Sequence, residues 1–550
     1  MPSRTEGLTG PIPTAMLLRQ LSLPLGLLLT GSLLCLLPGR ASAQASVLNR
    51  AVRSAPNHEP AIPRPEQDAA AEKALAALRE RTGRRPNIVW LVVDDLGYGD
   101  PGCYGGGAAV GAATPNIDRL AAEGLRLTSC YSQHTCTPTR SAILTGRLPV
   151  RTGLTRPILA GDRITKNPWD DELSVARLLS GNGYHTLLTG KWHIGEPEGM
   201  RPHDVGFDEF YGYYPAQKEI SQRFDARRYP DLVGNEERMK DFESIAPEDH
   251  LVHGFGTGET NKLARVESLE DMGRAEQVLA DFTCKRIAEL AKGDKPFFIE
   301  HCFMKVHADN HPNPDLFPLS AARYAYKEAV AEVDLHVGAI VAALRAAGVL
   351  DNTLVFFTSD NGPQMDAWPD AGYTPFRGAK GTTFDGGIRV PGIAHWPGMI
   401  AAGRESDEVF DLMDLFATAL HLGGVERSEL PTDRYFDSID QTSFLLADDG
   451  HSRRECVFFW WGSTLMGVRL GEYKLHLKVI LQQSPHMYID MATISDVGVA
   501  PWLFNLYIDP KEELTVGHRR NAWLASLGAE AKAHGATFKA FPPKDIGLGR

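Results

Sequence analysis

The chain has 550 residues, of which 43% are hydrophobic and 23% are charged, and its formal net charge at pH 7 is -12. This composition is typical of a globular protein with one large core or two smaller ones, and it excludes a disordered or low-complexity chain. Because no basic block offsets the acidic balance, the sequence also argues against a general nucleic-acid or membrane-surface binder.

The first 43 residues have the pattern of a signal peptide. Arg19 precedes the apolar run 21–37, and the small residues 41–43 form an A-x-A cleavage pattern. We therefore expect a mature chain that begins near Gln44, is secreted or periplasmic and has no stable membrane insertion after cleavage. A retained membrane anchor is the alternative, although prolines and glycines interrupt a run that is short for a bilayer span.

Removal of this leader leaves six cysteines, whose wide spacing forms no recognisable disulfide framework. They could pair in an oxidising compartment, but the sequence does not assign the pairs. These residues are Cys103, Cys130, Cys136, Cys284, Cys302 and Cys456.

Residues 44–84 are rich in proline and alanine and indicate a linker or N-terminal strap with one exposed helix. The region 85–425 then alternates strand-like and helical patterns. Its first run, "NIVWLVV" at 87–93, is typical of a strand buried on both faces of a parallel sheet. The residues between 315 and 348 predict a long amphipathic helix that ends at Gly348. The alternation predicts an α/β domain, with a large doubly wound mixed sheet flanked by helices.

The strand-like runs of this region are "NIVWLVV", "KPFFIEHCF" and "TLVFFTSDNG", and the shorter helical patterns are "TPNIDRLAAEG" and "ELSVARLLSGNG". Beyond residue 425 the pattern changes to aromatic-rich runs separated by turn residues, such as "CVFFWWG" and "LFNLYI". We therefore predict a smaller C-terminal α+β domain at 426–550, built on a largely antiparallel sheet.

Two predicted strands run directly into paired polar residues. The first is followed by Asp94 and Asp95, and "TLVFFTS" is followed by Asp360 and Asn361. In open α/β sheets ligands bind at the carboxyl ends of the strands, so these oxygen donors could converge on one hard cation, Ca²⁺ or Mg²⁺ rather than Zn²⁺. The alternative is that such residues only form Asx turns and helix caps.

The stretch "CTPTRSAILTG", which begins at Cys136, predicts a helix with the cysteine at its positive end. Pro138 suits the first turn of a helix, and Arg140, one turn further on, adds a fixed cation beside the cysteine. Anions are favoured at such a position. For a lone cysteine in a secreted protein, half of a disulfide is the alternative.

These residues resemble the first signature of the type I sulfatase family, which belongs to the alkaline-phosphatase-like superfamily. In this family the cysteine of C-x-P-x-R becomes Cα-formylglycine (3-oxoalanine). The stretch "GYHTLLTGKWH" at 183–193 resembles a second signature of the family, and the resemblance extends from Asn87 to Gly398. One departure is Thr139, where serine is commoner in the family. The resemblance implies a formylglycine-generating enzyme as the partner during maturation.

The resemblance also implies the chemistry. A formylglycine at position 136, hydrated to a diol, would attack the sulfur of a sulfate ester and later expel sulfate. One Ca²⁺ ion, with Mg²⁺ as the less favoured choice, would act as a Lewis acid. The implied metal ligands are Asp94, Asp95, Asp360, Asn361 and the modified Cys136. Arg140 would hold the formylglycine and neighbouring carboxylates.

Four further residues gain catalytic roles by the same resemblance. Lys191 would hold sulfate and the diol, and His193 would take the diol proton. His307 would bind sulfate or protonate the leaving oxygen, with His301 as the nearer rival. Lys380 would contact the sulfate and its bridging oxygen, and Ala379 before it excludes a P-loop. Solvated loop lysines and a packing histidine are the alternatives.

The function that follows is an arylsulfatase-type sulfuric ester hydrolase, acting on a small-molecule or glycan sulfate ester. Two alternatives stay open: a phosphonate monoester or phosphodiester hydrolase of the same fold, and a non-catalytic sulfoglycan-binding protein. We expect substrate choice to depend on residues 196–260, because loops at the rim of a site vary.

Overall fold

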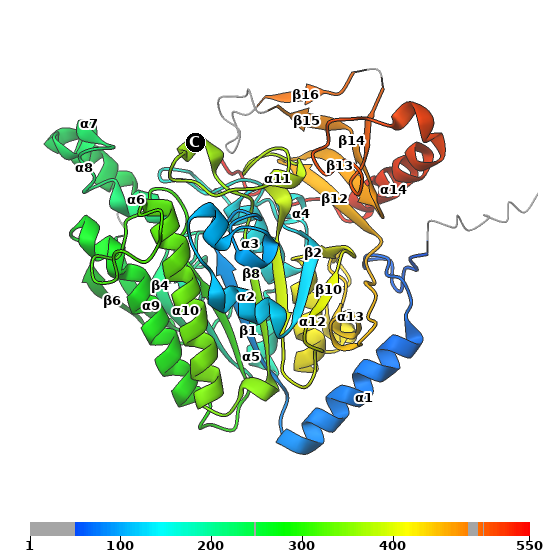
Figure 1. The fold of residues 1–550 in the computed structure, drawn as a ribbon, viewed down its shortest axis with the longest axis horizontal. Helices are drawn as coiled ribbons and strands as arrows, with labels where there is room; N and C mark the ends of the chain where they lie inside the picture. Colours follow the sequence, from blue (N-terminus) through cyan, green and yellow to red (C-terminus); the bar gives the residue numbers. More distant parts are fainter. Residues whose placement is uncertain (1–49, 247–248, 482–492, 499, 550) are drawn as a thin grey trace, which may run out of the picture. The chain divides into compact units, whose positions relative to one another are not determined.

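The computed structural model describes residues 50–246, 249–481, 493–498 and 500–549 (Figure 1). The predicted signal peptide at 1–43 lies outside these ranges. Within them, no helix has both the length and the apolar character needed to cross a membrane. The six cysteines left open above are all free thiols.

An eleven-stranded mixed sheet forms the centre of the fold, which confirms the predicted architecture. Five neighbouring strands, in the order β8-β1-β7-β3-β4, run parallel, and antiparallel strands flank them at both edges. The strands are β1 (Asn87–Val93), β2 (Leu125–Tyr131), β3 (His185–Lys191), β4 (Glu209–Tyr213), β5 (His250–Phe255), β6 (Thr260–Arg265), β7 (Phe297–Cys302), β8 (Thr353–Ser359), β9 (Arg389–His395), β10 (Arg404–Ser406) and β11 (Phe410–Asp411).

Helices cover both faces of this sheet, and β1 shows why its sequence is a continuous apolar run. Every residue of β1 is buried; its even-numbered hydrophobic residues pack into one core cluster and its odd-numbered ones into another. Because successive side chains of a strand point to opposite faces, both faces need apolar residues. The first cluster includes residues of α3 (Cys136–Thr145), α5 (Val175–Gly181) and α12 (Asp414–Gly423), and the second includes residues of α2 (Pro115–Ala122), α9 (Leu269–Leu290) and α10 (Ala325–Ala346).

The predicted long helix is α10, which lies beside α9 in Figure 1. Just past its end, Gly348 has a φ of 69°, the left-handed conformation expected of a glycine after a helix. The remaining helices are α1 (Pro65–Thr82), α4 (Pro149–Thr152), α6 (Gln217–Ser221), α7 (Pro230–Val233), α8 (Glu236–Ile245), α11 (Asp385–Ile388), α13 (Thr442–Leu446) and α14 (Asn521–Ala540).

A separate antiparallel sheet near the C-terminus is also as predicted. Its order is β12-β13-β14-β17, and α14 packs against it through Leu527 (Figure 1). A two-stranded ribbon, β15-β16, lies beside it. The strands are β12 (Cys456–Trp461), β13 (Thr464–Leu470), β14 (Tyr473–His476), β15 (Lys478–Ile480), β16 (Ile494–Asp496) and β17 (Trp502–Asn505). The domain boundaries at 84/85 and 425/426 stay a prediction.

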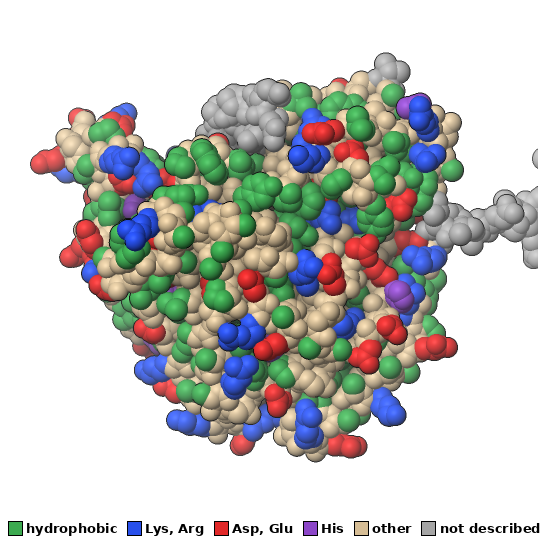
Figure 2. Space-filling view, viewed as in Figure 1, with side chains coloured by type: hydrophobic (Ala, Val, Ile, Leu, Met, Phe, Trp, Pro, Cys, Tyr) green, Lys and Arg blue, Asp and Glu red, His purple; other side chains and the backbone are tan. Residues whose placement is uncertain are grey.

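Charged side chains of both signs are interspersed over the face drawn in Figure 2. Exposed ion pairs are present among the described residues, such as Arg274 with Asp315 at 2.8 Å. This mixture on the described part of the face differs from the single-sign surface that a general nucleic-acid binder presents.

Candidate catalytic and metal site

The paired polar residues that follow β1 and β8 meet at one edge of the sheet. The two strands are parallel neighbours that end in register, so Asp94 and Asp95 lie beside Asp360 and Asn361. The backbone NH of Asp95 donates to Asp360 Oδ1 at 3.1 Å, and Asn361 Nδ2 donates to Asp95 Oδ1 at 2.7 Å. Asp95 has a φ of 63°, a backbone conformation that is uncommon for a non-glycine residue and concentrates at functional sites.

Helix α3 brings Cys136 to this edge as its first residue, as the sequence predicted. The side chain is buried, and its sulfur lies in a group of four ligand atoms, all within 4.8 Å of one another, that also includes Asp94, Asp95 and Asp360. The hydroxyl of Thr139, the departure noted in the sequence, bonds to the backbone of Gln133 just before the helix.

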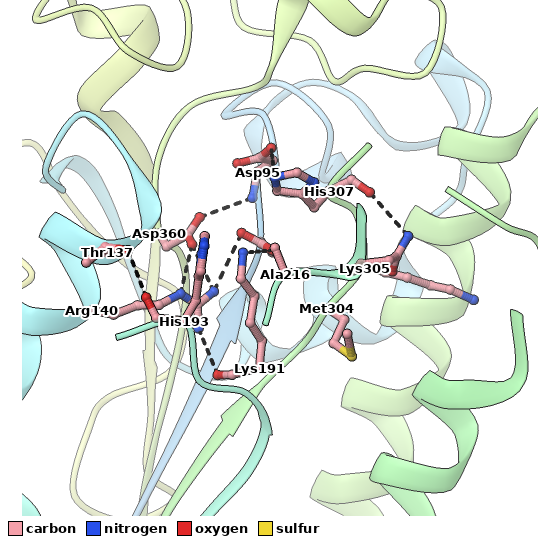
Figure 3. A network of polar contacts seen from close by, with 12 residues as sticks. Asp95, Thr137, Arg140, Lys191, His193, Ala216, Met304, Lys305, His307 and Asp360 are labelled. Atoms are coloured by element: carbon pink, nitrogen blue, oxygen red, sulfur yellow. Dashed lines mark hydrogen bonds and ion pairs between the residues drawn. The ribbon is translucent and has the colours of Figure 1, made fainter. Parts of the chain in front are cut away.

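Three buried cations stand against the three carboxylates, one to each. Figure 3 shows two of these cations, Arg140 and Lys191, converging on the cluster from different elements, together with the ring of His307. The formal charges of these six groups cancel, so the cluster as a whole carries no large net charge. The ion pairs are Arg140 Nη2–Asp360 Oδ2 at 2.8 Å, Lys191 Nζ–Asp94 Oδ2 at 2.5 Å and Lys380 Nζ–Asp95 Oδ1 at 2.8 Å.

The pKa values of Asp94 and Asp360 are shifted in opposite directions. Burial alone would raise the pKa of Asp94, but the charges of Lys191, His307 and Arg140 hold it well below its ordinary value. Burial and the charge of Asp94 instead raise the pKa of Asp360 to about 7. An added cation would favour the ionised form of Asp360.

Two oxygens of the cluster fit a metal ligand role. Asp94 Oδ1 and Asn361 Oδ1 are both buried and have no hydrogen-bond donor among the described residues. Buried oxygens without a donor are costly, and a cation would satisfy both. An all-oxygen set of carboxylates and a carboxamide suits a hard divalent cation.

Lys191 and His193 reach the site from the end of a strand and the turn that follows it. Lys191 is the last residue of β3, and His193 adopts a left-handed φ of 57°. The buried indole of Trp192 fixes the turn by donating to Gly195 O and Met200 O.

The ring of His193 is held in one orientation. Its Nε2 lies 2.9 Å from the carbonyl oxygen of Ile158, and a carbonyl only accepts, so Nε2 carries the proton. Nδ1 is buried and has no partner within the described ranges. Burial and the charge of Lys191 lower the pKa of His193 well below its ordinary value, so the ring is neutral and Nδ1 carries a lone pair.

Sequence reasoning missed Thr137, which joins the backbone at His193 to the backbone at Ile158. Its hydroxyl donates to His193 O at 2.8 Å and accepts from the backbone NH of Ile158 at 3.2 Å. The residue occupies a variable position of the C-x-P-x-R motif, so no pattern pointed to it.

His307, rather than His301, lies at the cluster. Its Nε2 is 3.7 Å from Asp95 Oδ2, and burial and the charge of Lys380 lower the pKa of His307 to about 4. The rival His301 is in β7, where its Nδ1 pairs with Thr283 of α9 at 2.9 Å.

The C-terminal sheet supports the loop that carries Lys380. Trp461 of β12 donates from its indole to Gly381 O at 3.1 Å, and Lys474 of β14 pairs with Asp385 at 2.8 Å. Sequence reasoning missed these contacts because they join residues far apart in the chain.

Comparison with known proteins agrees with this geometry. A family model described as Sulfatase matches residues 86–425. The N-acetylgalactosamine-6-sulfatase of Rattus norvegicus is 36% identical over 418 residues, 74% of each chain, and arylsulfatase A of Homo sapiens is 34% identical over 445 residues, 78% of this chain and 83% of the relative. The crystal structure of PsFucS1 sulfatase from Pseudoalteromonas sp. is 49% identical, with a TM-score of 0.88, and covers 92% of this chain and 100% of that one.

Proposed function

The chain belongs to the sulfatase family and is a sulfuric ester hydrolase, and from this premise we propose that it acts through a formylglycine formed from Cys136 with one bound Ca²⁺ ion. The observation that supports this proposal best is the position of Cys136. It is the first residue of α3, it is buried, and its sulfur lies within 4.8 Å of a ligand atom from each of three aspartates.

The encoded thiol itself is poorly suited to be the nucleophile. Burial raises the pKa of Cys136 to about 12, so the thiolate that would attack an ester is scarce at neutral pH. Conversion to an aldehyde by a formylglycine-generating enzyme, followed by hydration, would replace the thiol by two hydroxyls that need no such ionisation beforehand.

Turnover would then take two steps. One hydroxyl of residue 136 attacks sulfur and gives up its proton, and the bond from sulfur to the alcohol oxygen breaks as that oxygen takes up a proton, so the number of protons is unchanged in this step. The second hydroxyl then loses its proton to Nδ1 of His193, the bond from the residue-136 carbon to the sulfate breaks, and the aldehyde is regenerated. Splitting the reaction in this way lowers the barrier of each step.

The three cations would bind the tetrahedral sulfate, and their charge would stabilise the oxygen from which the alcohol departs. Lys191 and Lys380 are both buried, so each would act at full strength in a site with little water. His307 would contact the sulfate beside Lys380, and Arg140 would hold Asp360 and residue 136 in position.

The residues proposed to hold Ca²⁺ are Asp94, Asp95, Asp360, Asn361 and residue 136. When bound, the cation would supply Lewis acidity toward the sulfate and the attacking oxygen. The buried oxygens of Asp94 and Asn361 that lack donors support this ligand set.

We also propose that the substrate is a sulfate ester on a sugar, because a relative similar over most of its length is an N-acetylgalactosamine-6-sulfatase. We further propose a signal peptide at 1–43, secretion to the periplasm or the outside of the cell, and a catalytic domain at 85–425. Sequencing the N-terminus of the mature protein tests the cleavage, which should leave Gln44 first.

The decisive test begins with the mass of the peptide 132–147 from protein purified from its own host. A loss of about 18 Da, the change from thiol to aldehyde, is expected. Turnover of an aryl sulfate is then compared with turnover of a phosphodiester and a phosphonate monoester. Unmodified Cys136 in most molecules, or faster turnover of the phosphorus esters, would overturn the proposal.

A further inference from the structure

A cavity of about 350 Å³ lies beside His193, outside the carboxylate cluster. It is formed by the loop after α4, the turn that follows β3, the end of β4 and the last residue of α8, which lies at the edge of the molecule in Figure 1. A volume of this size is within the range of small-molecule sites. Among its lining residues are Ile158, Ile164, His193, Arg201, Tyr214 and Ile245.

His193 connects this cavity to the proposed reaction. His193 and Ile158 both line the cavity, the His193 ring is held by Ile158 O, and Nδ1 of this ring is the atom proposed to take a proton during sulfate release. A group attached to the sulfate would therefore find the cavity next to the reacting atoms.

The walls of the cavity are suited to a sugar. Ile158, Ile164 and Ile245 offer apolar surface, and Tyr214 offers an aromatic ring. Ile245 is 51% exposed, a high value for such a side chain. Apolar and aromatic side chains can pack against the C–H faces of a sugar ring, while a few polar groups fix its orientation.

Arg201 is the polar group with unused capacity. Its Nε donates to Glu196 O at 2.9 Å, and its guanidinium lies 5.7 Å from the centre of the Tyr214 ring. Among the described residues the Arg201 side chain forms no ion pair, in contrast to Arg156 nearby, which binds both oxygens of Asp162. The four N–H groups of its two terminal nitrogens form a planar fork that matches a carboxylate or a sulfate.

We propose that this cavity receives the sugar part of the substrate and that Arg201 binds a second anionic group on that sugar, either a carboxylate or another sulfate. The inference rests on the proposed function and names its substrate class. Arg201 is then a specificity-determining residue that favours doubly anionic sugars over sugars with a single sulfate.

The test compares four substrates: an aryl sulfate, a monosulfated sugar, the same sugar with a second sulfate, and a sulfated uronic acid. We expect wild-type kcat/KM for one of the doubly anionic sugars to exceed that for the monosulfated sugar by about 10- to 100-fold, the effect of one charged hydrogen-bonded contact. In Arg201→Met this preference should shrink about tenfold or more, mainly through KM. The anion that Arg201 binds is the one, second sulfate or carboxylate, whose sugar loses its higher kcat/KM in this variant.

The matched control is Arg163→Met, which removes an exposed arginine next to the lining residue Ile164 and should keep the wild-type preference. Arg201→Gln, which can still donate to Glu196 O, guards against a folding defect, and melting temperatures check both variants. An unchanged preference in folded Arg201→Met and Arg201→Gln, or an equal loss in Arg163→Met, overturns the inference.

Failure of the proposed function is distinguishable from this result. If wild-type protein turns over none of the sulfates, calorimetric binding of the same sugars to wild type and Arg201→Met decides the inference alone. Tighter binding of a doubly anionic sugar that disappears in the variant supports it, and equal binding of all the sugars to both proteins overturns it.

Discussion

Arg140 directs two N–H groups at a single oxygen of Asp360, with Nε at 3.1 Å and Nη2 at 2.8 Å from Oδ2. Both side chains are buried, so neither can turn to water if its partner is lost. We predict that Arg140→Met lowers the free energy of unfolding by about 3–5 kcal/mol, because a buried carboxylate is left without its cation.

Chemical denaturation measures this loss, and Arg126→Met is the control. Arg126 pairs with Glu405 in an exposed position, where an ion pair contributes about 1 kcal/mol or less. Similar losses in the two variants would contradict the assignment of Arg140 to a buried pair that holds the site.

Removal of divalent cations should abolish turnover, and Ca²⁺ should restore it better than Mg²⁺ does. At about 100 times its dissociation constant, Ca²⁺ should add about 2.7 kcal/mol to the free energy of unfolding, because it binds only the folded chain. Asn361→Leu should lose most of this gain, since it removes a proposed ligand oxygen. Asn313→Ala, which alters a buried asparagine beside Glu332, should keep it. An equal Ca²⁺ gain in both variants would count against the ligand set.

His193→Gln should separate the two chemical steps. The side-chain amide of the introduced glutamine can still donate to Ile158 O, but it offers no base at the position of Nδ1. We expect a burst of one equivalent of phenol from an aryl sulfate, followed by a stall with sulfate attached to the peptide 132–147. Rapid-mixing kinetics detect the burst of phenol, and the mass of the peptide 132–147 detects the attached sulfate. A variant that turns over slowly with no burst would show that His193 acts before or during sulfur attack instead.

His421, in the last turn of α12, should make stability depend on pH. Burial would lower its pKa, but hydrogen bonds and charges from Asp440 and Glu72 raise it to about 9. The folded pKa thus exceeds the unfolded value of about 6.5, so the stabilisation is complete below pH 6.5 and is lost as pH rises to 9. Because Glu72 is 61% exposed, screening reduces the effect to about 1 kcal/mol.

Denaturation at pH 6.5 and at pH 9 measures this change. The difference between the two pH values should shrink by that amount in His421→Leu and should persist in His518→Leu, which alters an exposed histidine. A wild-type difference that survives in His421→Leu would rule out this histidine as its source.

The centre of the fold could be predicted from the sequence because its strands are continuous apolar runs. The strand of 87–93 begins and ends as expected, and its acidic residues meet those after β8 because parallel neighbours end at the same edge. The edge strands could not be found in this way. Most of β6 is exposed, so its sequence carries no apolar pattern.

The residues that meet at the candidate site could be named from the sequence, but the contacts that support them could not. The backbone turn at His193 depends on the indole of Trp192 and the hydroxyl of Thr137, and neither contact has a local sequence signal. The pairing of Lys474 with Asp385 joins residues 89 positions apart, which only the folded chain brings together. Local patterns specify which groups are present, whereas long-range packing sets their orientation.

The burial of Cys136 and Arg140, each 1% exposed, constrains when the proposed maturation of Cys136 takes place. Once α3 has packed against the sheet, a second protein cannot bind this buried segment. An enzyme that oxidises Cys136 must therefore act on the nascent or still extended chain. Modification of Cys136 is therefore possible only before the chain folds. Unmodified protein that has already folded is therefore a dead end, and mixing it later with the maturation enzyme cannot rescue it unless it is first unfolded.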